Sequence, residues 1–174
     1  MASRRSFIAG LLATSLMPKP TWADAGSPAF LSAAMKPDRS HVLCGLDADG
    51  SIKFETALPD RGHAAAAHPT TPEAVAFARR PGTYANVLDC RTGHTKARLE
   101  APVGRHFYGH GTFSADGGLL FTTENDYEAA AGIIGIWDVQ DDYLRIGEFS
   151  SGGIGPHDIE LMPDGKTLVV ANGG

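Results

Sequence analysis

Cysteine is scarce in this chain and never paired in sequence. Cys44 and Cys90 are the only two cysteines, so the chain has neither a Cys-x-x-Cys-His haem attachment site nor the paired cysteines of a structural zinc site. A disulfide between them is permitted in an oxidising compartment, but their spacing does not require one. We expect two free, buried thiols.

Positive charge is also in short supply. The sequence has 15 Lys and Arg against 20 Asp and Glu, a net charge of −5. Cleavage after residue 23 would remove three basic residues and no acid, which takes the net charge to about −8. Beyond that point Arg79-Arg80 is the only adjacent basic pair. Because nucleic-acid binding depends on clustered Lys and Arg, we expect no nucleic-acid partner.

Long apolar runs and familiar catalytic motifs are absent as well. The apolar stretch at 7–17 is interrupted by Gly10, Thr14 and Ser15, and it is shorter than the ~20 residues that cross a membrane as a helix. We therefore expect no membrane span in the mature chain. The sequence has no nucleophile elbow, no dinucleotide fingerprint and no Ser/His/Asp set in a recognisable order.

The N-terminal segment has the pattern of an export signal. A twin arginine in Ser3-Arg4-Arg5-Ser6-Phe7-Ile8 precedes the apolar run, and small residues at Thr21-Trp22-Ala23 form a cleavage region. This order predicts that residues 1–23 are a twin-arginine signal peptide and that the protein is exported folded to the periplasm. Cleavage after Ala25 and an uncleaved anchor are the alternatives.

Three histidines recur at a fixed interval. His63, His110 and His157 are each 47 residues apart, and two apolar strands that end in Asp89 and Asp138 are 49 residues apart. A period of ~40–50 residues with several short strands per unit is typical of β-propeller blades. The repeat therefore predicts an all-β fold, a β-propeller with four-stranded blades.

The repeat also predicts where the strands lie. Asp-Gly pairs at 49–50, 116–117 and 164–165 favour tight hairpins, and the loop at 124–132 has room for a helical turn at most. We expect strands at 63–67, 73–78, 84–89, 95–99, 109–113, 118–123, 132–138, 143–149, 157–161 and 167–171, with 41–47 and 51–56 closing an earlier blade.

These strands make about three blades in residues 24–174, whereas closed propellers have four to eight. We therefore expect residues 24–174 to be the N-terminal part of a longer propeller. The alternative is a ring closed by two or more copies of the chain.

Five segments of the chain, taken together, carry a resemblance to a known family. They are Ala78–Gly82, Arg105–Gly111, Thr123–Glu128, Gly153–His157 and Val170–Gly174. Together they make the chain resemble a bacterial family of twin-arginine-exported propeller proteins, the domain of unknown function 1513. The stretch Pro163–Asn172 also resembles the repeat of surface-layer propellers.

The resemblance implies a seven-bladed propeller of roughly twice this length. It also implies a role near periplasmic iron-uptake and peroxidase-like components, and so in metal handling, with a protein of an iron-uptake system as a candidate partner. The family has no established catalytic residues, so none is carried over. Asp158 stands where the resemblance leads us to expect Glu.

Equivalent positions in successive blades surround one axis, so His63, His110 and His157 are expected to converge at one mouth of the channel. Imidazole is a common metal ligand, and Fe, Cu or Zn is the expected ion. His68 and His106 lie within five residues of the repeated histidines and are further candidate ligands. The alternatives are histidines that hydrogen-bond the backbone, or that act in acid–base catalysis.

Polar residues around the repeated histidines are candidate ligand-binding groups. Arg105 and Tyr108 flank a Gly-His-Gly stretch and suit an anion. Glu124 is a candidate metal ligand or base, and Asn125 and Asn172 end equivalent strands, where Asn usually binds loop backbone. The alternative for Glu124 is a salt bridge with one of three arginines, Arg79, Arg80 or Arg105.

Taken together, the sequence predicts a periplasmic propeller that binds a metal, a small ligand or a partner protein. The alternative is a propeller enzyme, either a lactonase-like hydrolase or a metal- or quinone-dependent oxidoreductase. Propellers host many activities, so the fold does not decide between them.

Overall fold

The computed structural model describes residues 27–173, all of them in strands, turns and loops. The expected signal peptide at residues 1–23 and its cleavage point lie outside the described residues. Among residues 27–173 no helix is long and apolar enough to cross a membrane.

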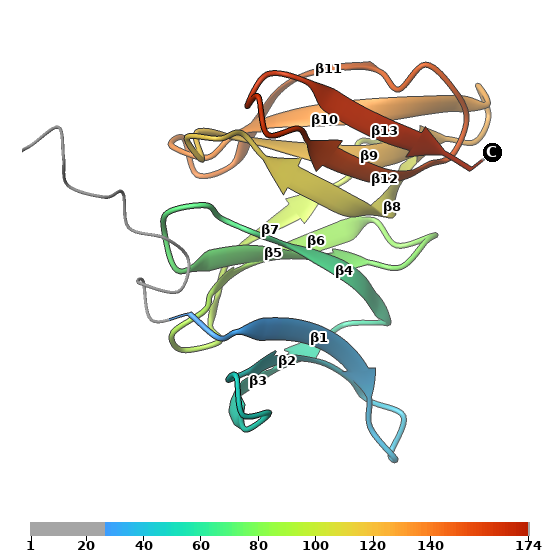
Figure 1. Cartoon of the computed structure of the whole chain (residues 1–174). Coiled ribbons are helices and arrows are strands. Elements are labelled where there is room, and N and C mark those ends of the chain that lie inside the picture. Colours follow the sequence, from blue (N-terminus) through green and yellow to red (C-terminus); the bar gives the residue numbers. More distant parts are fainter. Residues whose placement is uncertain (1–26, 174) are drawn as a thin grey trace, which may run out of the picture.

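The strands form four antiparallel sheets in chain order, and Figure 1 shows the first three stacked one above the other. In each sheet every strand pairs with the next one along the chain. The strands are β1 (Phe30–Met35), β2 (His41–Leu46) and β3 (Ile52–Leu58); β4 (Gly62–Ala67), β5 (Glu73–Ala78), β6 (Tyr84–Asp89) and β7 (Thr95–Glu100); β8 (Arg105–Phe113), β9 (Leu119–Asp126), β10 (Ala131–Asp138) and β11 (Leu144–Ser150); and β12 (Pro156–Leu161) and β13 (Leu168–Asn172).

Contacts between sheets show which strand of each repeat is innermost. Strand β8 contacts both β4 and β12, so the first strands of three successive repeats lie side by side. Strand β1 contacts β4 in the way that β5 contacts β8 and β9 contacts β12. By this equivalence β1 is the second strand of its repeat, and β2 and β3 are the third and fourth.

The all-β class and the antiparallel sheets of three to four strands confirm the coarse prediction, and the arrangement is consistent with propeller blades. Three local details differ from it. Strand β1 was not anticipated, and β8 begins at Arg105 rather than at 109. The loop expected at 124–132 is shorter, because β9 runs to Asp126 and pairs there with Ala131 in a tight hairpin, in which Ala130 has a φ of 51°.

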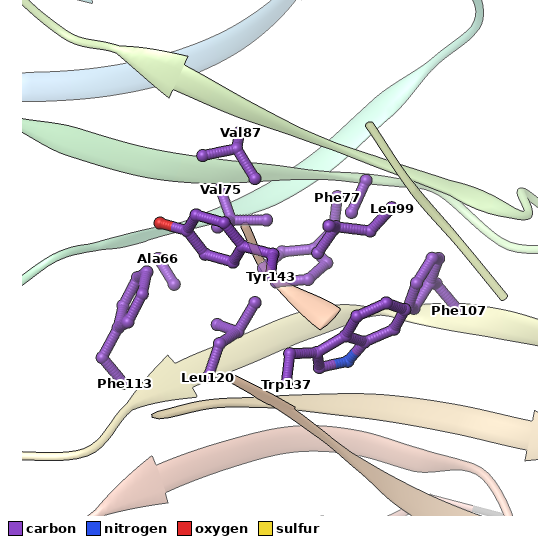
Figure 2. Close-up of a cluster of buried hydrophobic side chains, with 11 residues drawn as sticks. Ala66, Val75, Phe77, Val87, Leu99, Phe107, Phe113, Leu120, Trp137 and Tyr143 are labelled. Atoms are coloured by element: carbon purple, nitrogen blue, oxygen red, sulfur yellow. The ribbon is translucent and has the colours of Figure 1, made fainter. Parts of the chain in front are cut away.

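A buried apolar cluster joins the second and third sheets (Figure 2). The Phe107 ring lies 6.2 Å from the ring of Phe77 and 6.2 Å from that of Trp137. The Trp137 indole N–H donates a hydrogen bond of 2.9 Å to the Thr122 hydroxyl, so the buried ring leaves no unpaired donor. This cluster packs β5 against β8. Because β4 pairs with β5, the inner strand β4 is also fixed relative to the inner strand β8.

Both cysteines are free thiols. Cys90 is buried, as expected, and burial raises its pKa to about 12. Cys44 is only partly buried, because it lies in a strand of the first sheet, one face of which is less covered. A thiol held in its protonated form is a poor nucleophile, so Cys90 is a packing residue.

Candidate functional site

Each of the three repeated histidines lies at an irregularity in an inner strand. The regular pairing shifts between Gly62 and Ala65 in β4, between Phe107 and Gly111 in β8, and between Pro156 and Asp158 in β12. His63, His110 and His157 fall inside these three bulges. A β-bulge bends its strand and redirects a side chain. The three histidine side chains therefore do not follow the regular alternation of side chains between the two faces of a sheet.

The three rings meet between β4, β8 and β12. Their centroids are 4.9 Å apart for His63 and His110, 5.7 Å for His63 and His157, and 5.4 Å for His110 and His157. One nitrogen of each ring lies within 4.8 Å of those of the other two. We call these three residues the histidine cluster.

The backbone around His110 is held tightly. The Thr123 hydroxyl donates to the His110 carbonyl at 3.0 Å and accepts from its N–H at 3.3 Å, and Thr123 is fully buried. Gly109 has a φ of 107°, and a side chain at this position would collide with the His63 ring. A residue without a Cβ is therefore required beside the cluster.

The electrostatic environment of His63 and His110 favours the uncharged form of their rings. Burial, with the nearby His110 ring and Arg79, lowers the pKa of His63 below its ordinary value. Burial also lowers the pKa of His110, although the carboxylate of Asp158 opposes this. Neutral imidazoles keep a nitrogen lone pair free at neutral pH, which is the form that binds a metal.

Asp158 sets the orientation of one ring. Its Oδ1 lies 2.9 Å from Nδ1 of His110. Nδ1–H of the neutral ring then donates to the carboxylate and leaves Nε2 with the lone pair. A carboxylate behind a ligand histidine has this role in many metal sites. In the sequence Asp158 stands out only as an Asp where the family resemblance leads us to expect Glu, and residue spacing does not predict this contact.

Tyr108 lies at the edge of the cluster. Its ring centroid is 6.2 Å from that of His157, and the Arg80 guanidinium lies 5.0 Å from the Tyr108 centroid and donates a hydrogen bond to its hydroxyl. A hollow of about 30 Å³ is lined by His63, Arg79, Arg80, Tyr108 and His157.

The structure does not bring the other two candidate histidines to the cluster. Both ring nitrogens of His68 are engaged by backbone, since Nδ1 accepts from the N–H groups of Thr70 and Thr71 and Nε2 lies 3.1 Å from the Gly117 carbonyl. His106 lies 5.2 Å from the ring of Tyr127, and its Nδ1 is buried without a hydrogen-bond partner.

Glu124 belongs to a separate ionic network. Its buried carboxylate accepts from Arg145 at 2.9 Å and from the Thr122 hydroxyl at 3.1 Å, with Arg105 at 3.7 Å. Burial raises the pKa of Glu124, against the effect of Arg145. Glu148 pairs with both arginines, and its hydrogen bond from Arg105 helps to lower its pKa to about 2. Arg105 was among the expected partners of Glu124, whereas Arg145 was missed.

The two candidate asparagines hold the loop that leads into β12. Asn125 is buried, and its Oδ1 accepts from the Gly155 N–H at 2.9 Å. The Asn172 amide accepts from the Ser151 hydroxyl at 2.7 Å and donates to the Ser151 carbonyl at 3.1 Å. Both side chains therefore bind the backbone or side chains of the segment just before His157, and so fix its position.

Comparison with known proteins gives one family. The model of the family described as "Protein of unknown function (DUF1513)" matches residues 56–174, a stretch that contains all three histidines of the cluster. No curated protein matches the chain. The match covers more than half of the sequence, and the chain therefore belongs to the DUF1513 family.

Proposed function

We propose that this protein binds a first-row transition-metal cation through His63, His110 and His157. The observation that carries the proposal is the meeting of three imidazoles, from three different inner strands, with one nitrogen of each within 4.8 Å of the others. Imidazole nitrogens suit Zn, Cu, Fe or Ni. Three protein ligands also leave a coordination position open to a further group.

The dimensions of the cluster suit such an ion after a small adjustment. Metal–nitrogen bonds of about 2.0–2.1 Å place tetrahedral ligands roughly 3.3 Å apart. The cluster nitrogens lie within 4.8 Å of each other, so modest rotations about the side-chain torsions bring all three onto one ion. Asp158 supports this because it already fixes the His110 ring.

The wider setting is part of the same proposal. The repeat and the blade-like sheets support a β-propeller, and residues 1–23 have the pattern of twin-arginine export to the periplasm. There the protein would be a scaffold for metal handling, with Fe, Cu or Zn as the ion and an iron-uptake protein as its partner.

The contacts of Glu124 are with Arg145, Arg105 and Thr122 rather than with the cluster. The carboxylate that does contact the cluster, Asp158, holds the His110 ring, and we therefore favour metal binding over the alternative of a propeller enzyme.

The test is metal stoichiometry. Full-length protein, stripped with a chelator, is dialysed against Zn²⁺ or Cu²⁺ and analysed by elemental mass spectrometry. We expect one ion per chain in the wild type, and at least 100-fold weaker binding in His63→Ala, His110→Ala and His157→Ala, because each removes a ligand.

The matched control is His94→Ala, since His94 is exposed and lies in the turn between β6 and β7. This variant keeps wild-type binding if the cluster is the site. Equal metal content in all four variants, or no stoichiometric metal in the wild type, would show that the proposal is wrong.

A further inference from the structure

Two arginines stand beside the histidine cluster without a carboxylate partner. Arg79 and Arg80 directly follow β5 and are exposed. Within residues 27–173, neither forms an ion pair with Asp or Glu. In contrast, Arg105 and Arg145 are each paired with Glu148. The two unpaired guanidinium groups are therefore available to a ligand.

These arginines share a hollow with two members of the cluster. The hollow is lined by His63 and His157 on one side, and by Arg79, Arg80 and Tyr108 on the other. The Tyr108 ring and hydroxyl both contact the Arg80 guanidinium. Contact with an aromatic face holds an arginine in a fixed orientation. Arg80 is therefore already placed at the edge of the hollow before any ligand arrives.

The local charge points to the kind of ligand. Arg79 and Arg80 line the same hollow as His63 and His157, so a metal cation in the cluster would lie beside two further positive charges. The carboxylate of Asp158 is behind His110, and the hollow is lined by no acid. The positive charges of the metal cation and of the two guanidinium groups repel one another. A negative group in the hollow would remove this repulsion and occupy the position that three histidines leave open on a metal.

We infer that the histidine cluster takes its metal together with a compact oxyanion, a carbonate or carboxylate group that bridges the ion and the guanidinium groups of Arg79 and Arg80. This inference rests on the proposed function and names the second component of the same site. Guanidinium groups bind such planar oxyanions through paired hydrogen bonds. A hollow of about 30 Å³ admits only a small group.

The experiment uses the full-length protein loaded with Co²⁺, whose visible absorption reports changes in coordination. Bicarbonate and acetate are titrated separately, so that a free inorganic anion is distinguished from the carboxylate of an organic acid. We expect at least one of the two to saturate a single site and to tighten metal binding by the same factor by which the metal tightens anion binding.

Arg79→Met and Arg80→Met are expected to weaken anion binding at least tenfold, and to leave metal binding in anion-free buffer unchanged or tighter. The control is Arg98→Met, because Arg98 lies on β7 and is paired with Glu100. Unchanged anion binding in both Arg79→Met and Arg80→Met overturns this inference but does not affect the proposed metal site. A wild-type protein that binds no Co²⁺ overturns both.

Discussion

Zn²⁺ at 100 times its dissociation constant raises the thermal unfolding midpoint of the wild-type protein by about 5–10 °C, because the ion binds the folded state. Such binding adds about 2.7 kcal/mol at this concentration, and each kcal/mol shifts the midpoint by about 2–4 °C in a chain of this size. The His157→Ala variant lacks one ligand from β12 and gains almost nothing. Circular dichroism at increasing temperature measures the shift.

Two comparisons make this result specific to the cluster. His94→Ala retains the full shift, since its imidazole is exposed and belongs to the turn between β6 and β7 rather than to β4, β8 or β12. A chelator returns the wild type to its metal-free midpoint. An equal shift in wild type and His157→Ala would show that Zn²⁺ acts elsewhere, and the cluster would then not be the site.

Glu124→Gln lowers the free energy of unfolding by about 3 kcal/mol, the lower end of the range for breaking a buried ion pair. The Glu124 side chain is fully buried and accepts hydrogen bonds from Arg145 and Thr122. The amide keeps the size of the side chain but loses the charge that balances Arg145. The loss stays near the lower end because Glu148 still pairs with Arg145. Urea unfolding of both proteins measures the difference.

The matched control is Glu100→Gln, which removes the partner of Arg98 at an exposed site. Exposed pairs contribute about 0–1 kcal/mol, so this variant should unfold almost like the wild type. If Glu124→Gln also stays within about 0.5 kcal/mol of the wild type, the buried network does not stabilise the third sheet as described.

The sequence predicted most strands because their ends carry strong turn signals. Asp116-Gly117 and Asp164-Gly165 lie between paired strands where the repeat places them. Strand β1 was missed because Phe30–Met35 is apolar except for Ser32 and shows no alternation of apolar and polar residues. Its membership depends on pairing with β2, such as Met35 opposite His41, which no local pattern reveals.

The 47-residue period predicted which histidines share an equivalent position, and the structure brings those three rings together. The bulges that aim them were not predictable, because an extra residue in a strand leaves no periodic signal. The one hint in the sequence was Gly109, because a glycine has no Cβ and so leaves room for the His63 ring.

Partners that come from distant strands were beyond sequence reasoning. Arg145 reaches Glu124 across the third sheet, and Asp158 reaches His110 from β12 to β8. In both cases the contact depends on how strands lie against each other rather than on residue spacing. The contact between Arg80 and Tyr108 beside the cluster is another example. The sequence shows Arg80 only as part of an adjacent basic pair.

The most direct test of a three-histidine metal site is X-ray absorption spectroscopy of the full-length protein loaded with one equivalent of Zn²⁺ or Cu²⁺. We expect three imidazole nitrogens at about 2.0 Å from the ion, falling to two in His110→Ala. A spectrum with oxygen or sulfur ligands only, or one unchanged by His110→Ala, would contradict the assignment of the cluster as the metal site.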